Sequence, residues 1–397
     1  MMSMRRRTLK VATYVTLLAL ASCGDRGTQE ERSAVPAQRP GPAAVPEFNV
    51  GHVGHDHQLA LYVAALEGDA LEPRCGAYLK EIKRKEVYDL MEGGTRCARL
   101  HLIKVGGGSR MPAAMERGEI DIGLGGVAPV AFFVDKGNPF KIVFPLQTDG
   151  DMLVMRPDFP ATDWNSFVDH VNSSDRALKI GYKAPVAVAK LIFAKGLDTE
   201  AIRVATAPGE EGGKIGLVNL QGEGNMVPSL LSGAVDGFVI NQPHASTAVY
   251  KKAGKIVCDL STLPPAGKWE QHPCCCVAAT ESVIAGHRGI LKAFLKVLHA
   301  ATELITSDQQ LAIRDAAAWT KLPEEVERDS VPSVKYLNVP TAKWKSGMET
   351  WAEMMADLGK FTGSLRDKSA REVADSICDL SIIEEILSES EAQDVSW

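Results

Sequence analysis

The feature that most constrains the fold is an alternation of short apolar runs with helical patterns after the first fifty residues. The first apolar run, at 48–53, is followed by a helical pattern at 58–68. In that pattern Leu59, Tyr62 and Leu66 fall on one helical face. Such alternation is typical of a largely parallel sheet with crossover helices, so we predict an α/β fold. The further predicted strands lie at 100–106, 119–126, 141–148, 178–182, 215–221 and 234–241, and the helices at 110–118, 185–197 and 226–233.

Two similar phrases predict that the α/β pattern forms two lobes. "AMERGEIDIGLGG" and "SLLSGAVDGFVINQP" begin about 115 residues apart, and each runs from a helix through Gly-X-X-Asp into a buried strand. A chain of 397 residues also exceeds what one core usually serves. We expect lobe 1 to comprise residues 48–150 plus 246–397, and lobe 2 residues 151–245.

The pattern becomes helical in the last third of the chain. Helical segments are expected at 290–308, 341–360 and 369–389, because apolar residues recur there on one face. We expect these helices to pack on lobe 1.

The N-terminus is typical of an exported lipoprotein. A cationic start, "MMSMRRRTLK", precedes the apolar run "VATYVTLLALAS", which is too short to span a bilayer. The next residues, "LASCG", resemble a bacterial lipobox with Cys23 as the lipidated cysteine. We therefore expect a signal peptide at 1–22 and a disordered, Pro- and Ala-rich tether at 23–47. A plain secretory signal, without a role for Cys23, is the alternative.

Composition and missing motifs exclude several classes of function. A net charge of −6 and the lack of a basic-aromatic cluster argue against a nucleic-acid partner. The chain has no GXXXXGK[ST], GXGXXG or GXSXG motif, and no paired carboxylates stand out. We therefore expect neither a cofactor nor an enzymatic activity.

The cysteines allow a disulfide but not full pairing. Seven follow Cys23, an odd number, so at least one thiol has no intramolecular partner. Cys75 and Cys97 bracket a charged segment and are the candidate pair. Export makes a disulfide permissible.

Three histidines, His52, His55 and His57, lie where the first strand gives way to the first helix. Unpaired N–H groups at such a junction favour a polar or anionic ligand. Similar loops occur at "VGGGSRMP", "GLGGVAPVAFF" and "INQPHAS", and the four could converge on one cleft.

A metal site is the alternative for these histidines. His52, His55 and His57 could join cysteines of the run Cys274–Cys276, although no HEXXH or paired CXXC motif is present. Side chains alternate along a strand, so Cys274 and Cys276 would share a face and Cys275 would not. The simplest interpretation of this run is a buried strand with cysteine as a small apolar residue.

Several phrases in order resemble solute-binding proteins of the nitrate, sulfonate and taurine ABC importers. They are "YVAALEG", "VGGGSRMPAAMERGEIDIGLGGVAPVAFFVDKG", "KIVFPLQTDGDMLVM", "KIGY" and "SGAVDGFVINQPHA". The resemblance implies a type II periplasmic-binding fold, in which two α/β lobes joined by a hinge close on a ligand. It implies a site formed by His55, Asp56, His57, Gln58, Gly126, Val127, Thr148, Asp149, Asn241 and His244, to which we add Cys274 and Cys276 as a pocket wall.

The same superfamily includes fungal-type enzymes that make the thiamine pyrimidine precursor and carry a CCCFC motif. His57 and Cys274–Cys276 match that pattern in part, but the run continues with Val277 and Ala278. An enzyme that consumes its own histidine and cofactor makes little sense outside the cell. A binding protein for a pyrimidine-like ring stays open.

These observations predict a monomeric, lipid-anchored, extracytoplasmic component of an ABC transporter. It would capture a small polar or anionic solute and deliver it to a membrane permease. Nitrate, a sulfonate, taurine, bicarbonate and a thiamine-type pyrimidine are all compatible. The alternative is an exported metal-binding protein or metal-dependent enzyme that uses His52, His55, His57 and Cys274–Cys276.

Overall fold

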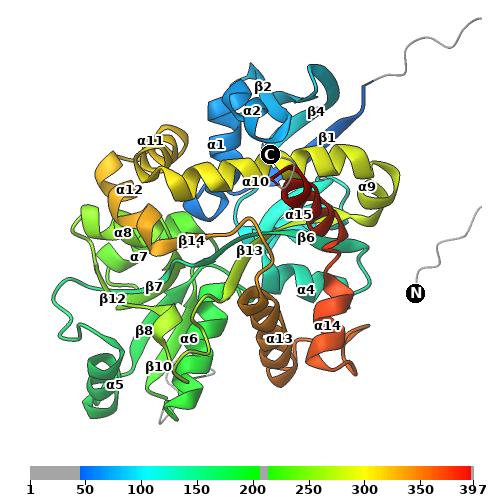
Figure 1. The fold of residues 1–397 in the computed structure, drawn as a ribbon. Helices are drawn as coiled ribbons and strands as arrows, with labels where there is room; N and C mark the ends of the chain where they lie inside the picture. Colours follow the sequence, from blue (N-terminus) through cyan, green and yellow to red (C-terminus); the bar gives the residue numbers. More distant parts are fainter. Residues whose placement is uncertain (1–44, 206–212, 395–397) are drawn as a thin grey trace, which may run out of the picture. The chain divides into compact units, whose positions relative to one another are not determined.

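The computed structural model describes residues 45–205 and 213–394 (Figure 1). The predicted signal peptide, Cys23 and nearly all of the predicted tether lie outside these residues. In the part of the chain that is described, no helix combines the length and the apolar character needed to cross a membrane.

The first sheet has eight strands in the order β14-β6-β13-β5-β1-β4-β3-β2. At its centre β1 pairs in parallel with β4 and β5, and the remaining pairs are antiparallel. The strands are β1 (Glu47–His52), β2 (Ala77–Lys83), β3 (Val87–Glu92), β4 (Thr95–Lys104), β5 (Ile122–Gly126), β6 (Phe140–Asp149), β13 (Pro273–Thr280) and β14 (Val334–Tyr336).

The second sheet has six strands in the order β12-β7-β11-β8-β10-β9. Parallel pairs join β8 to β10 and β11, whereas β7 runs antiparallel to both of its neighbours. The largely parallel pairing that we predicted therefore holds at the centre of the first sheet and, in the second sheet, from β11 to the edge strand β9. The strands are β7 (Asp151–Met155), β8 (Leu178–Tyr182), β9 (Val204–Ala205), β10 (Ile215–Asn219), β11 (Gly237–Asn241) and β12 (Lys255–Asp259).

Helices cover both sheets. The longer ones of the first half are α1 (Leu59–Glu67), α4 (Val127–Asp135), α5 (Trp164–Ser173) and α6 (Val188–Thr199), with the shorter α2 (Glu72–Cys75), α3 (Met111–Glu116), α7 (Met226–Leu231) and α8 (His244–Tyr250). Those that follow β13 are α9 (Glu281–Gly286), α10 (Arg288–Ser307), α11 (Gln309–Thr320), α12 (Glu324–Ser330), α13 (Ala342–Asp357), α14 (Ala370–Ile377) and α15 (Ser381–Asp394). The short 3-10 turns that matter for the site are η1 (Asp56–Gln58), η3 (Gly108–Arg110) and η4 (Glu223–Asn225).

The C-terminal helices lie against the first sheet, where α13 contacts β13 and α14 contacts β6 (Figure 1). The segment 369–389, which we predicted as one helix, forms two. The chain breaks at Cys378, which bridges to Ile142 of β6, and the Asp379 carboxylate accepts a hydrogen bond from the backbone N–H of Ser381. Pairing with the sheet edge thus overrides the helical periodicity.

The chain passes between the sheets at two places. Gly150 alone separates β6 of the first sheet from β7 of the second, and residues 260–272 connect β12 back to β13. This arrangement gives the two α/β lobes of the periplasmic-binding fold, with the two connections as the hinge. We predicted the lobe boundary at residue 245; because β12 pairs with β7 of the second sheet, we propose a boundary near residue 260.

The predicted disulfide is wrong, because Cys75 and Cys97 are both free. Cys75 ends α2 just before β2, whereas Cys97 lies on β4, and β3 runs between those two strands. The Cys75 thiol instead donates to the carbonyl oxygen of Ala77.

Candidate functional site

A small pocket, with a cavity volume of about 20 Å³, lies where strand ends of the two lobes meet. A cavity of this volume holds about one water molecule. Five of the predicted site residues line it: His55, His57, Gly126, Asn241 and Cys274. The other lining residues are Gly108, Ser109, Pro129, Asp151, Lys183, Val188, Ala189 and Cys275.

The histidine segment leaves the end of β1 and presents two imidazoles to the pocket. His57 lies in η1, and the backbone of His55 immediately before it is extended. The two rings meet edge to face with their centroids 5.3 Å apart, and both side chains are buried. The Nε2 atom of His57 lies 3.2 Å from the carbonyl oxygen of Gly150, at the first hinge connection. His57 therefore links the pocket directly to the hinge.

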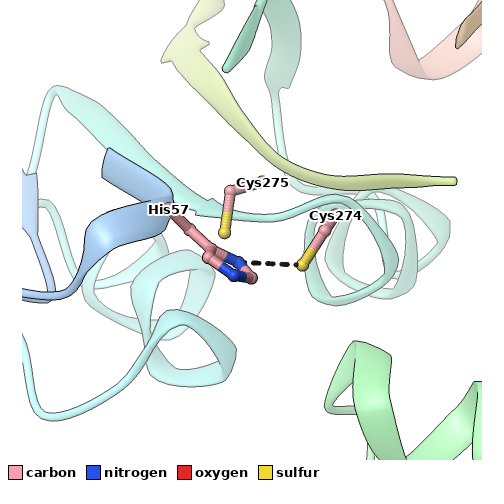
Figure 2. Close-up of side chains that lie close together, drawn as sticks. All are labelled: His57, Cys274 and Cys275. Carbon is pink, nitrogen blue, oxygen red and sulfur yellow. Dashed lines mark hydrogen bonds between the residues drawn. The ribbon is translucent and has the colours of Figure 1, made fainter. Parts of the chain in front are cut away.

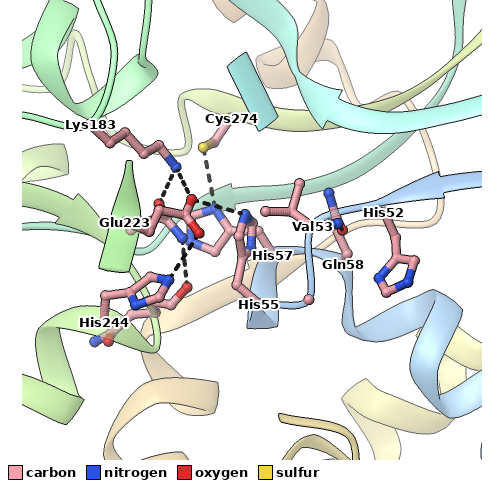
Figure 3. Close-up of polar contacts among 12 residues, drawn as sticks. His52, Val53, His55, His57, Gln58, Lys183, Glu223, His244 and Cys274 are labelled. Atoms are coloured by element: carbon pink, nitrogen blue, oxygen red, sulfur yellow. Dashed lines mark hydrogen bonds and ion pairs between the residues drawn. The ribbon is translucent and has the colours of Figure 1, made fainter. Parts of the chain in front are cut away.

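The second lobe supplies a buried charged network (Figure 3). Lys183 follows β8, and its ammonium donates to Glu223 Oε1 at 2.7 Å and also to the side-chain oxygen of Asn241. His244 Nε2 lies 3.1 Å from Glu223 Oε2, and His55 Nε2 lies 3.9 Å from Glu223 Oε1. Glu223 thus pairs with Lys183 and His244 of the second lobe and lies close to His55 of the first.

Burial and pairing shift the pKa values in this network in opposite directions. Burial alone would raise the pKa of Glu223, but Lys183 and His244 hold it well below its usual range. Burial would lower the pKa of Lys183, yet the Glu223 carboxylate raises it. Burial lowers the pKa of His55 well below its usual range, so this imidazole is neutral near pH 7. The network therefore holds one ammonium and one carboxylate.

Two neighbouring cysteines, Cys274 and Cys275, approach His57 from β13 (Figure 2). Our expectation that Cys274 and Cys276 would share a face is wrong. The pairing of β13 with β6 shifts between Pro273 and Cys275 and again between Cys275 and Cys276, so side chains do not alternate there. Cys274 Sγ lies 3.3 Å from His57 Nδ1, whereas the Cys276 thiol donates to the carbonyl oxygen of Gly125.

The pKa values of the two thiols are shifted in opposite directions. A hydrogen bond from Cys274, followed by interaction with His57, lowers the pKa of Cys275 to about 6. Burial raises the pKa of Cys274 well above its usual range. Cys275 is therefore the more acidic of the two thiols.

Several predicted residues support the site from outside the pocket. The side chain of Gln58 accepts from the backbone N–H of Val53 and donates to the carbonyl oxygen of Leu124, and it thereby ties the histidine segment to β5. Asp56 points away and accepts a hydrogen bond from Ser330. Val127 is buried at the start of α4.

Other predicted residues lie elsewhere. Thr148 and Asp149 line two separate grooves and not this pocket. His52 packs edge-on against Tyr62 and Trp319 and lines another cavity with Lys85 and Lys104, so it is not part of the histidine pair. His244 does not line the pocket but contacts Glu223 of the charged network.

Sequence reasoning missed Lys183, Glu223, Asp151 and Cys275. Lys183 directly follows β8 and Asp151 begins β7, so the rule that ligands bind at strand ends would have found the lysine. Glu223 lies in η4, in a loop without a motif, and nothing in the sequence marks it. Cys275 was excluded by strand alternation, which the irregular pairing of β13 breaks.

Comparison with known proteins places the chain in a family. The model of the NMT1-like family matches residues 77–321, which is more than half of the chain. The chain belongs to the NMT1-like family. A protein of Methanocaldococcus jannaschii without a known function is 30% identical to this NMT1-like protein over 158 residues, which make up 39% of the chain and 99% of that relative.

Solved structures share the fold of this NMT1-like protein at low sequence identity. The nitrate-binding protein NrtA of Synechocystis has a TM-score of 0.66 at 12% identity, covering 87% of this chain and 89% of its own. A zinc-bound ligand-binding component of an ABC-type import system from Staphylococcus aureus has a TM-score of 0.64 at 14% identity, with coverages of 86% and 99%. The alkanesulfonate-binding protein SsuA of Xanthomonas axonopodis, bound to MOPS, has a TM-score of 0.57 at 15% identity, covering 81% of this chain and 96% of its own. The NMT1-like chain therefore has the periplasmic-binding fold that the sequence predicted.

Proposed function

We propose that this protein is the extracytoplasmic solute-binding component of an ABC importer. The observation that carries the proposal is a pocket whose walls come from both lobes, with His55, His57 and Cys274 from one and Lys183 and Asn241 from the other. The structural relatives with this fold include binding proteins for nitrate and alkanesulfonate. The captured solute would be passed to a permease in the membrane.

Burial of the pocket residues indicates how the solute would enter. His55 and His57 are each 1% exposed, so a molecule cannot reach them unless the lobes part. The hinge at Gly150 and at 260–272 allows such an opening. We infer that the described state is the closed one.

The charges in the pocket favour a neutral or zwitterionic solute over a bare anion. Among the described residues that line it, Lys183 carries the single Lys or Arg charge, and Glu223 already pairs with that ammonium. Asp151 adds a carboxylate, whose pKa the hydrogen bond from His272 lowers against the opposing effect of burial. Among the described lining residues an anion would meet the Asp151 carboxylate and no unpaired cation, because the Lys183 ammonium is paired with Glu223 outside the lining. Taurine or a pyrimidine ring therefore fits better than nitrate.

A thermal-shift panel tests this function. The purified protein is melted with nitrate, bicarbonate, an alkyl sulfonate, taurine and an aminopyrimidine, since a ligand that binds the native state raises the melting temperature. We expect taurine or the aminopyrimidine to raise it and nitrate to have no effect. His57→Ala should abolish the shift without loss of the fold. A panel without any shift would contradict the proposal.

Lipid anchoring at Cys23 is a separate part of the proposal and rests on the lipobox-like sequence alone. Cys23→Ser should release the protein from the membrane fraction of the producing bacterium into the soluble exported fraction. Equal membrane association of both forms would refute the anchor and leave the solute-binding function intact.

A further inference from the structure

We propose that His57, Cys274 and Cys275 bind one zinc(II) ion, with a coordination position left open toward the pocket. One ring nitrogen of His57 and the two Sγ atoms all lie within 4.8 Å of one another, and all three side chains are buried (Figure 2). The inference does not depend on the transport function.

The distances suit a tetrahedral zinc ion. Zn–S bonds of about 2.3 Å and Zn–N bonds of about 2.0 Å place tetrahedral ligand atoms roughly 3.5 to 3.8 Å apart. Cys274 Sγ already lies 3.3 Å from His57 Nδ1, in a hydrogen bond that the ion would replace. The Cys274–His57 distance therefore needs to grow by only a few tenths of an ångström, and the remaining distances, all within 4.8 Å, need a shift of at most about 1 Å.

The hinge backbone sets the tautomer that a metal ligand needs. A carbonyl oxygen can only accept a hydrogen bond, so the contact of His57 Nε2 with Gly150 O at 3.2 Å places the ring proton on Nε2. The lone pair of Nδ1 then faces the two thiols. Metal-bound histidines generally make such a hydrogen bond through their second nitrogen.

The irregular strand presents both thiols to one point. A regular strand would direct adjacent side chains to opposite faces, but the register shifts around Cys275 bring it to the side of Cys274. Cys276, the third of the run, faces Gly125 instead. The bulged segment thus builds a two-thiol site that a buried apolar strand does not require.

A disulfide between the two cysteines is the competing use of these thiols. Adjacent Cα atoms are only about 3.8 Å apart, which is shorter than the usual disulfide separation of roughly 4.4 to 6.8 Å. Both cysteines are free in the structure. Two thiolates also match the charge of a divalent ion, so the buried complex would be neutral.

His55 lies near the coordination position that the proposed zinc ion leaves open. His55 lines the same pocket, and its Nδ1 has no hydrogen-bond partner among the described residues. Three protein ligands plus an exchangeable fourth is the arrangement of zinc sites that bind a further molecule. If the proposed function is right, a donor atom of the solute can occupy that position.

Metal titration of the full-length chain, purified in detergent under reducing conditions, tests the site. Cobalt(II) reports tetrahedral thiolate ligation by its visible and sulfur-to-cobalt absorption bands. We expect one equivalent of cobalt to produce these bands and one equivalent of zinc to abolish them. Cys274→Ser, Cys275→Ser and His57→Ala should each weaken zinc binding by about tenfold or more.

Cys276→Ser is the matched control, since it alters a buried cysteine of the same strand, and Cys258→Ser in β12 is the second control. Both should bind zinc within about twofold of wild type, and melting curves show which variants are folded. The proposal is overturned if cobalt gives no thiolate bands, or if a folded Cys274→Ser/Cys275→Ser variant keeps wild-type affinity. Solute-induced thermal shifts that persist after chelation would leave the transport function standing without the metal.

Discussion

At the scale of single residues, Gly150 connects the hinge to the site. Its φ of +79° lies in the left-handed region, and an added Cβ would lie 2.7 Å from His57 Nε2 and 2.8 Å from a methyl carbon of Val334. Its carbonyl oxygen also accepts the hydrogen bond from His57. One glycine thus permits the turn between the lobes and the position of the imidazole.

Gly150→Ala should therefore cost both stability and binding. Left-handed strain alone costs about 1–2 kcal/mol, and displacement of His57 adds to it. Gly76→Ala is the matched control, because Gly76 has a φ of +70° but an added Cβ there would meet no atom within 4 Å. Urea unfolding should show the larger loss at Gly150, and only Gly150→Ala should weaken solute or zinc binding. Equal losses of stability in Gly150→Ala and Gly76→Ala would show that backbone strain alone, without displacement of His57, accounts for the effect.

His52 makes stability depend on pH. Burial, aided by Lys104 and Lys85, lowers its pKa from 6.5 to about 4. Below pH 6.5 the unfolded chain therefore binds a proton that the folded chain does not, and stability falls as the pH drops toward 4.

Between pH 7 and pH 4 this loss amounts to about 3 kcal/mol. Relative to His52→Gln, the wild type should lose that much stability over this range, as measured by urea unfolding at each pH. His101→Gln, which changes a partly exposed histidine, is the control. A pH-independent difference between wild type and His52→Gln would contradict the assignment.

Sequence could predict only part of the site at this scale. The positions of His55, His57 and Asn241 followed from strand ends, because strand–loop junctions are visible in the hydrophobic pattern. Cys275 could not be predicted, since a register shift depends on how two distant strands pair. The Cys75–Cys97 pairing failed for the same reason, because β3 intervenes between them.

At the scale of elements, the loops after β8 and β10 meet in the Lys183–Glu223 pair. Its atoms are 2.7 Å apart and both side chains are nearly buried, at 12% and 13% exposed. A buried pair is costly to break on one side only, because the partner charge is left uncompensated.

Lys183→Met should therefore destabilise the protein by about 3–5 kcal/mol. The double variant Lys183→Met/Glu223→Gln should recover part of this loss, since it removes the orphaned carboxylate. Lys195→Met, which breaks the surface pair with Asp198, should cost less than about 1 kcal/mol. Additive losses in the double variant, measured by thermal or urea unfolding, would refute the coupling.

Helices and strands could be predicted from the sequence where a local pattern of residues determines the element. Strands β8 and β10 and the helices α1, α3 and α7 lie close to the predicted segments, because their periodicity and flanking glycines are local signals. The β2–β3 hairpin, β7 and β12 were not predicted. The places of β7 and β12 depend on their long-range pairing with each other, whereas β2 and β3 pair locally as a hairpin.

At the scale of the whole molecule, the repeated strand–helix phrases correctly indicated the two-lobed fold. They did not show that the chain returns to the first sheet only after β12, because the crossing at 260–272 carries no repeat. The central claim is that the lobes close over a solute bound at His57. Domain closure of this kind changes the dimensions of a protein in solution.

Small-angle X-ray scattering of the purified protein, with and without solute, tests that claim most directly. The compound that raises the melting temperature should reduce the radius of gyration of the wild type and leave that of His57→Ala unchanged. A radius of gyration that stays constant in the wild type at saturating solute would contradict the claim that this protein works by closing its two lobes.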